Sequence, residues 1–139
     1  MRLVPISTKM ITLCTLLALN FISLQGKEGT AIATDFTRSI QFAKGKNSAI
    51  IDGGVVRADA DIYLLHAKDG QKMAVQIGAV EDNAVIQILS PKKRYLPGAG
   101  EYDDAKAWQG VLPVSGKYKI IVRGARGNAT YQLKIVIEP

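Results

Sequence analysis

From Ile40 to the end of the chain, apolar and polar residues alternate with a period of two, and clusters of turn residues interrupt the alternation. This pattern is typical of short β-strands with one buried and one wet face. It predicts about eight strands, whose apolar residues lie within the segments 40–42, 49–56, 63–67, 73–77, 84–88, 108–112, 118–122 and 131–137. Two sheets that face each other would bury one apolar face apiece. We therefore predict a single antiparallel β-sandwich of jelly-roll or Greek-key type over residues 36–139.

The connections between these segments carry the residues that turns require. Residues 68–71 read as a hairpin turn in which Gly70 adopts a positive φ, and residues 113–116 form another turn. Gly53 and Gly54 interrupt the second segment, which predicts a bulge or a bend between sheets. A longer irregular stretch spans residues 92–105, and a short loop spans 124–128.

The first 26 residues have a different character. Arg2 and Lys9 accompany an apolar run from Met10 to Leu24, and small residues follow, the last of them at Gly26, Ala31 and Ala33. This order is typical of a secretory signal peptide. The run of 15 residues is shorter than a transmembrane helix needs. We predict a signal peptide at residues 1–26, with cleavage there or as late as residue 33, and a periplasmic or secreted mature chain without a membrane anchor.

The mature chain offers few groups for catalysis. The only cysteine, Cys14, lies in the leader, so no disulfide or cysteine ligand is available. His66 is the sole histidine, and the alternation turns it away from the apolar face of its strand. The sequence contains no Gly-x-Ser-x-Gly turn and no phosphate-binding loop. We therefore predict that the protein is not an enzyme and has no cofactor.

Two acidic stretches are candidates for calcium binding, because calcium takes oxygen ligands. They are Asp59 and Asp61 before the third predicted strand, and Glu101, Asp103 and Asp104 in the long stretch. Their spacing matches no complete calcium loop, so we predict no metal site and keep calcium as the alternative.

The charge of the chain bears on its partners. Beyond Arg2 and Lys9, 16 Lys and Arg residues stand against 12 Asp and Glu residues, and the excess is spread along the sequence. A nucleic-acid site would cluster such residues with aromatic ones, so we expect no nucleic-acid partner. A mild positive charge favours envelope polymers or an acidic patch on a protein.

Exposed Tyr and Arg on loops of a rigid scaffold supply much of the energy of protein interfaces. The candidate partner-binding residues are Arg94, Tyr95 and Tyr102 in the long stretch and Arg123 and Arg126 in or beside the short loop. Ser115 and Tyr118 are candidates in the turn between the sixth and seventh strands. That turn has two interpretations, since Tyr118 also suits a buried ring with a hydrogen-bonded hydroxyl.

Several motifs, in this order, resemble the pre-peptidase C-terminal (PPC) type of β-sandwich. They are IQFAKG at 40–45, DIY at 61–63, AKDGQ at 67–71, WQGVLP at 108–113, SGKY at 115–118 and YQL at 131–133. Within that group the chain is similar, over residues 38–137, to the small periplasmic lysozyme inhibitors of the g-type and i-type. The resemblance implies a binding protein that inhibits a lysozyme (muramidase) by inserting loops from one end of the sandwich into its active-site cleft. The alternative is a non-catalytic accessory module for envelope polysaccharide or another protein.

Three loops differ from what the resemblance implies. The g-type pattern has an aromatic residue before the third strand, where this chain has VRAD at 56–59. It also has a longer, Arg-rich connection before the last strand, where this chain has GARGN at 124–128. The i-type pattern has a Ser-Gly-x-x-Tyr loop, and SGKY at 115–118 is one residue shorter. The lysozyme class and the strand order therefore stay open at this point.

Overall fold

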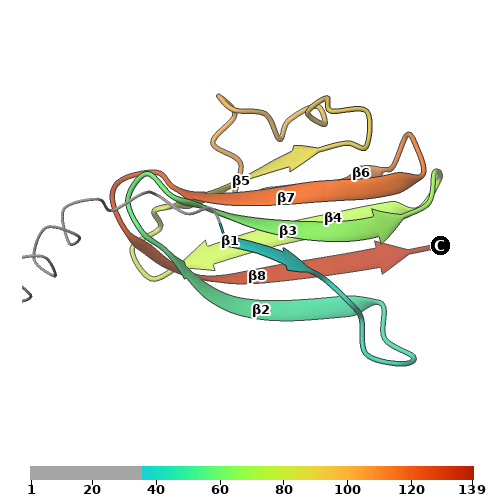
Figure 1. The fold of residues 1–139 in the computed structure, drawn as a ribbon, viewed down its shortest axis with the longest axis horizontal. Coiled ribbons are helices and arrows are strands. Elements are labelled where there is room, and N and C mark those ends of the chain that lie inside the picture. Colours follow the sequence, from blue (N-terminus) through green and yellow to red (C-terminus); the bar gives the residue numbers. More distant parts are fainter. Residues whose placement is uncertain (1–35) are drawn as a thin grey trace, which may run out of the picture. The chain divides into compact units, whose positions relative to one another are not determined.

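The computed structural model describes residues 36–139, which form eight strands (Figure 1). The strands are β1 (Phe36–Ser39), β2 (Ser48–Val55), β3 (Ala60–Ala67), β4 (Lys72–Ala79), β5 (Ala84–Leu89), β6 (Ala107–Val111), β7 (Gly116–Gly124) and β8 (Ala129–Glu138). These residues contain no helix, so none that could span a membrane. The signal peptide predicted at residues 1–26, and its later cleavage point at 33, lie outside the described residues.

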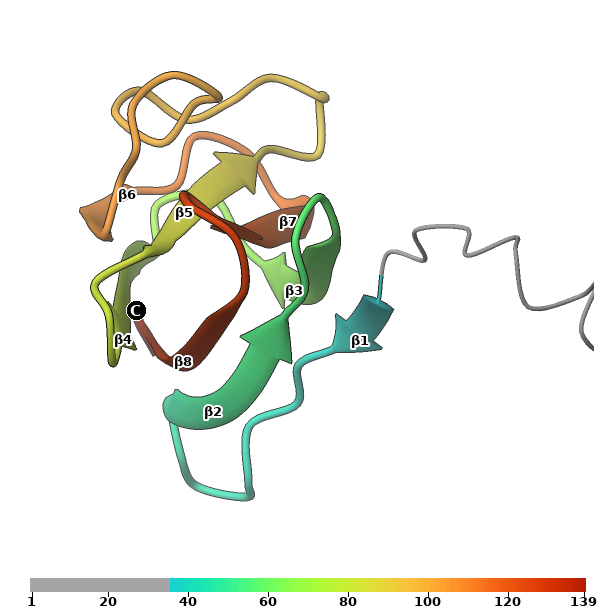
Figure 2. The ribbon, with the colours of Figure 1, turned by 90° about the vertical axis from the view of Figure 1, so that its left-hand side faces the viewer.

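The strands form the predicted sandwich of two four-stranded sheets, with the orders β1-β3-β7-β5 and β2-β8-β4-β6 (Figure 2). Odd-numbered strands make one sheet and even-numbered strands the other, so every connection crosses between the sheets. The turn at 68–71 is therefore not a hairpin of paired strands, as its sequence had suggested. Gly70 does adopt the predicted positive φ, at 80°.

The direction of pairing follows from the long loop, residues 90–106. This loop leaves β5 at one end of the sandwich and returns along the edge of that strand, so β6 to β8 reverse their directions relative to strict alternation. Each antiparallel pair accordingly joins a strand before the loop to one after it. β1 and β3 both precede the loop and pair in parallel, while the other pairs of the described strands are antiparallel, as the predicted antiparallel sandwich requires.

The first strand lies earlier in the chain than the alternation predicted. β1 ends at Ser39, and Ile40 and Phe42 follow it. Ile40 still donates from its backbone N–H to the Leu64 carbonyl, at 2.8 Å, and both side chains pack against the core. Both side chains are half-buried, although they follow the strand and do not belong to it.

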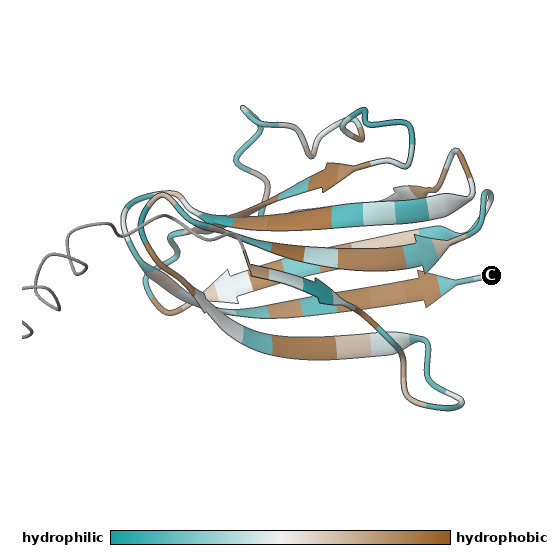
Figure 3. Ribbon diagram, viewed as in Figure 1, coloured by the Kyte–Doolittle hydropathy of each residue, from teal (hydrophilic) through white to brown (hydrophobic). Residues whose placement is uncertain are grey.

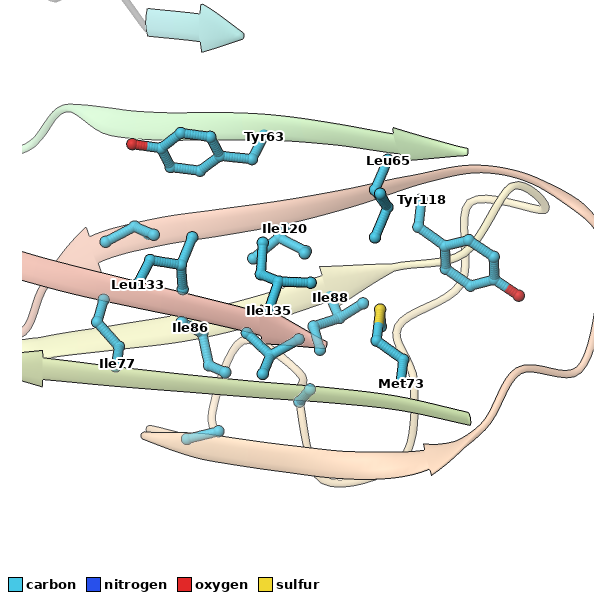
Figure 4. Close-up of a cluster of buried hydrophobic side chains, with 14 of the residues drawn as sticks. Tyr63, Leu65, Met73, Ile77, Ile86, Ile88, Tyr118, Ile120, Leu133 and Ile135 are labelled. Carbon is cyan, nitrogen blue, oxygen red and sulfur yellow. The ribbon is translucent and has the colours of Figure 1, made fainter. Parts of the chain in front are cut away.

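The core lies between the sheets, where inward side chains from both meet (Figure 4). Along β7, Tyr118, Ile120 and Val122 point inward, and bands of hydrophobic and hydrophilic residues alternate on this strand (Figure 3). The predicted core aromatic residues Tyr63, Tyr118 and Tyr131 are buried.

Trp108 is only half-buried, because β6 is an edge strand with few inward neighbours. Its indole Nε1–H donates to the Pro97 carbonyl at 2.9 Å and so ties the long loop to this edge. Full burial would imply a loss of about 3–5 kcal/mol on replacement by Ala. Because Trp108 is half-buried, its replacement by Ala should cost less than this.

A row of hydrogen-bonded polar side chains crosses the core. The Tyr131 hydroxyl donates to Asp61 Oδ2 at 2.5 Å, and the Tyr63 hydroxyl lies 2.6 Å from that of Tyr131. Burial, followed by the hydrogen bond to Asp61, raises the pKa of Tyr131, so its proton stays available to the carboxylate.

Gly53 makes room for the Tyr131 side chain of this hydrogen-bonded row. A Cβ on Gly53 would lie 2.5 Å from the ring and hydroxyl of Tyr131. The register of β2 with β8 runs through Gly53 and Gly54 without interruption, so the predicted bulge does not form. The glycine is needed for the ring that packs over it.

Candidate functional site

Three connections meet at one end of the sandwich, on the left in Figure 1. They are residues 56–59 between β2 and β3, 80–83 between β4 and β5, and 125–128 between β7 and β8. We call this surface the three-loop end. The turns at 40–47, 68–71 and 112–115 lie at the opposite end with the C-terminus.

Hydrogen bonds from two asparagines hold the three loops together. Asn83 is 5% exposed, and its Nδ2 donates to the Asn128 carbonyl at 2.6 Å, while its own carbonyl accepts from Ala125 N at 2.7 Å. Asn128 Oδ1 accepts from the Arg57 backbone N–H at 2.8 Å. Loops fixed in this way lose little conformational entropy when a partner binds. The three-loop end is therefore a preorganised surface.

A shallow groove of about 760 Å³ lies between these loops. Val56 and Val80 line it and are 58% and 91% exposed. Arg126 and Glu81 add one charge of each sign. Within residues 36–139 the Arg126 guanidinium makes no ion pair, so it is free to form bidentate hydrogen bonds with a partner's carboxylate. The groove thus combines apolar contact area with a cation.

The long loop runs from the opposite end to the three-loop end. It begins with a turn in which Ser90 N donates to the Arg94 carbonyl, so Arg94 lies far from Arg126. It continues beside β5 and ends at Lys106, whose Nζ pairs with Asp82 Oδ1 at 2.6 Å. Tyr102 lies in the second half of the loop and is 93% exposed.

Tyr95 lies beside the end of β5, where it forms a bridge with Leu89. The Tyr95 hydroxyl donates to Glu101 Oε1 at 3.2 Å. Burial, and then the charge of Glu101, raise the pKa of Tyr95, while the positive charge of Arg123 opposes them. Arg123 is the second-to-last residue of β7, directly before Gly124 and the connection at 125–128. The structure therefore places Arg123 and Arg126 at the three-loop end, whereas Tyr95, directly after Arg94, lies farther from it.

Ser115 and Tyr118 lie at the opposite end. Ser115 Oγ accepts from the Asp69 backbone N–H at 2.9 Å and joins two turns. The Tyr118 ring is fully buried, and its hydroxyl donates to the Val114 carbonyl at 2.6 Å. This geometry matches the structural interpretation of the turn, in which the hydroxyl closes the chain on itself.

Replacing Tyr118 with Phe is expected to lower the free energy of unfolding by about 1–2 kcal/mol, because the partly buried Val114 carbonyl loses its donor. Partner binding should be unchanged, since the ring does not reach the surface. Urea denaturation and a binding titration measure the two effects. Weaker binding at unchanged stability would instead give Tyr118 a contact role.

The sequence did not single out the residues that organise the three-loop end. Asn83 and Asn128 each stand directly before an Ala that begins a strand, and this repeated Asn-Ala pair was the available signal. The exposure of Val56 and Val80 had none, because a valine at a strand end reads as core. Ala58, between them in the chain, has a φ of 71°, a conformation that is often found at functional sites.

The residues considered as catalytic groups or metal ligands were His66 and two acidic stretches. His66 is exposed on the outer face of β3. Among residues 36–139, no three His, Cys, Asp or Glu side chains lie close enough to hold a metal ion. The two acidic stretches considered for calcium form no such group within this part of the chain.

Comparison with known proteins adds to this geometry. No protein-family model matches the sequence. An inhibitor of g-type lysozyme from Escherichia coli is 30% identical over 111 residues, which cover 72% of this chain and 75% of the relative. The crystal structure of Aeromonas hydrophila PliG, a periplasmic inhibitor of g-type lysozyme, is 37% identical and has a TM-score of 0.63, covering 74% of this chain and 96% of that one.

Two further structures extend the comparison. Salmonella Typhimurium PliG, also a periplasmic inhibitor of g-type lysozyme, is 27% identical with a TM-score of 0.60, covering 76% of this chain and all of that one. The pre-peptidase C-terminal domain of a Bacillus anthracis collagenase, at 13% identity and a TM-score of 0.51 over 77% of this chain and 99% of that one, shares the fold alone. The resemblance seen in the motifs is confirmed by these matches. With a relative 30% identical over three quarters of its length, the chain belongs to the family of g-type lysozyme inhibitors.

Proposed function

We propose that the chain is a periplasmic protein that binds and inhibits a g-type lysozyme. The observation that carries this proposal is membership of a family whose relatives inhibit g-type lysozyme. It favours the g-type over the i-type, which the sequence left open. The partner is accordingly a protein.

The three-loop end is the surface that suits this partner best. Its loops are fixed by Asn83 and Asn128, and Arg126 has no intramolecular ion pair in the described residues. Glycosidases work with carboxylates in their clefts, and a guanidinium pairs with a carboxylate through two parallel hydrogen bonds. Insertion of this end would place Arg126 against such a carboxylate.

Apolar contacts would accompany the charge. Val56 and Val80 flank the groove and are largely exposed. Their exposed apolar surface does not stabilise the free protein, and its burial against a partner would favour binding. Val56 lies in the loop where the g-type pattern has an aromatic residue. Tyr95, Tyr102 and Arg123 would extend the contact from the side of the long loop. Arg94 and Ser115 lie toward the opposite end and would contribute only to a larger interface.

The test is inhibition of cell-wall lysis by g-, c- and i-type lysozymes with purified mature protein. We expect inhibition of the g-type enzyme at micromolar concentration or below, and none of the other two. Selective inhibition of the i-type enzyme would shift attention to the turn at 115–118. No inhibition of any class would contradict the proposal.

The alternative, an accessory module for envelope polysaccharide, predicts a different result. Such a module would be retained on insoluble peptidoglycan in the absence of lysozyme. Retention without inhibition would favour it, and inhibition without retention would exclude it as the main function.

A further inference from the structure

The end opposite the three-loop end gathers most of the positive charge. Of the fifteen Lys and Arg residues and ten Asp and Glu residues between Phe36 and Pro139, eight cations and only two acidic residues lie there. The cations are Lys44, Lys46, Lys68, Lys72, Lys92, Lys93, Arg94 and Lys117, and the acidic residues are Asp69 and Glu138. We call this surface the lysine end.

Contacts between turns make the lysine end continuous. Asp69 N donates to Ser115 Oγ at 2.9 Å, which joins the turn of Lys68 to the turn that precedes Lys117. Pro91 packs so closely on Gly116 that a Cβ there would lie 2.9 Å from the proline ring, which places Lys92 and Lys93 beside the same turn.

The loop that carries Lys44 and Lys46 joins this surface from the other sheet. Asn47 accepts a hydrogen bond from Ile137 N at 2.9 Å, beside the Glu138–Lys72 strand pair. The turns at 40–47, 68–71 and 90–94, with the first residues of β4 and β7, therefore present their charges at one end of the sandwich, at the right of Figure 1.

These charges are unpaired and exposed. All eight cationic residues are exposed, and the one ion pair within residues 36–139, Lys106 with Asp82, lies at the three-loop end. The remainder of the described domain holds seven cations and eight acidic residues. The net positive charge of the domain is thus a property of one end, which the linear sequence does not show.

The character of the end indicates the kind of partner. Seven of its eight cations are lysines, which act as point charges without the planar fork that Arg offers a single carboxylate or phosphate. They come from the turns at 40–47, 68–71 and 90–94 and from the first residues of β4 and β7, so an extended anionic surface can meet them together. Of the large exposed aromatic residues, Phe36 and Tyr102 lie outside these turns and only Tyr95 directly follows one of them, so the end offers little stacking for nucleic-acid bases. Val111, exposed beside Lys72, adds one apolar side chain.

We propose that the lysine end rests on an anionic phospholipid bilayer, held by the headgroup phosphates. Because the two functional surfaces are at opposite ends of the sandwich, the bound protein would present the three-loop end away from the bilayer. Lipid binding and binding of a lysozyme would then be compatible. The orientation rests on the proposed function, whereas the lipid contact does not.

The test is co-sedimentation of the purified mature protein with vesicles. We expect binding to vesicles of phosphatidylglycerol mixed with phosphatidylcholine, and none to phosphatidylcholine alone. Raising the salt from about 0.15 M to about 1 M should release the protein, because the Debye length falls from about 8 Å to about 3 Å.

A charge-matched pair of variants tests the location. The triple variant Lys44→Gln, Lys68→Gln and Lys92→Gln takes one charge from each of three turns, and should reduce partitioning by on the order of 100-fold, about fivefold for each lysine. The control triple variant Arg57→Gln, Lys119→Gln and Lys134→Gln removes the same charge from elsewhere, and should change partitioning by less than about fivefold. Thermal melts verify that both variants are folded.

The outcomes separate this proposal from the proposed function. The lysine-end variant should inhibit lysozyme in solution as well as the parent does. Equal losses in the two variants, binding to neutral vesicles, or absence of binding to anionic ones would overturn the lipid proposal. Release from the vesicles by duplex DNA at constant ionic strength would also overturn it, in favour of a nucleic-acid partner.

Discussion

Replacing Arg126 with Ala is expected to weaken the complex with a g-type lysozyme by about thirtyfold, which corresponds to about 2 kcal/mol. Arg126 lines the groove of the three-loop end, and its guanidinium makes no ion pair within residues 36–139. Asn83 Nδ2 donates to the backbone carbonyl of Arg126, and the substitution keeps this carbonyl. The loss should therefore come from contacts with the partner.

The measurement is a titration of binding or inhibition together with a thermal melt. The melting temperature should stay within about one degree of the parent, because surface substitutions away from special features cost little. Lys134→Ala is the matched control, an exposed cation on the outer face of β8 that should not affect inhibition. Tyr102→Ala tests the long loop in the same assay. Parent-like inhibition by both Arg126→Ala and Tyr102→Ala would mean that the partner binds elsewhere.

Replacing Gly53 with Ala should destabilise the domain by about 3 kcal/mol. The added Cβ would lie 2.5 Å from the Tyr131 ring, so the ring must move. Overpacking of this kind costs about 1–3 kcal/mol. Displacement of the Tyr131 hydroxyl also deprives buried Asp61 of its hydrogen bond, which costs about 1–3 kcal/mol more.

Gly78→Ala supplies the control for this prediction. Gly78 also lies within a strand, but a Cβ there would meet nothing within 4 Å. Its replacement should leave stability unchanged or raise it by up to about 1 kcal/mol through the unfolded chain. Urea denaturation of the three proteins gives the comparison. If both variants unfold like the parent, the close packing of Tyr131 on Gly53 is not a constraint in solution.

Much of the fold was predictable because the strand pattern is local. In β3, β4, β5, β7 and β8 the inward residues follow directly from the alternation, since successive side chains in a strand point to opposite faces. The turn at 68–71 and the positive φ of Gly70 were predictable for the same reason. The motifs carried the family resemblance, which the relatives confirm.

The pairing of the strands was not predictable, because it depends on where the chain returns after β5. The alternation at 84–88 and 108–112 says nothing of the path taken by residues 90–106 between them. Their return along β5 sets the direction of β6, β7 and β8, and leaves β1 parallel to β3. β1 itself was placed too late, because Ile40 and Phe42 pack half-buried against the core although they lie outside a strand.

The candidate site shows the same division. The sequence identified Arg123, Arg126, Tyr95 and Tyr102 by residue type and loop position, but could not determine which end of the sandwich each loop occupies. The buried Asn83 and the exposed Val80 acquire their roles only where three connections from distant parts of the chain meet.

The sequence by itself determined the strands from β2 to β8, the inward faces of most of them, the turns and the family, because each depends on neighbouring residues. The tertiary structure alone decided the strand order, the groove between the three loops and the separation of charge between the two ends. Those features depend on which distant segments become neighbours. Lys44, Lys68 and Lys92 are spread along the chain as part of a dispersed excess, and form one surface only because alternate crossings between the sheets bring their turns to the same end.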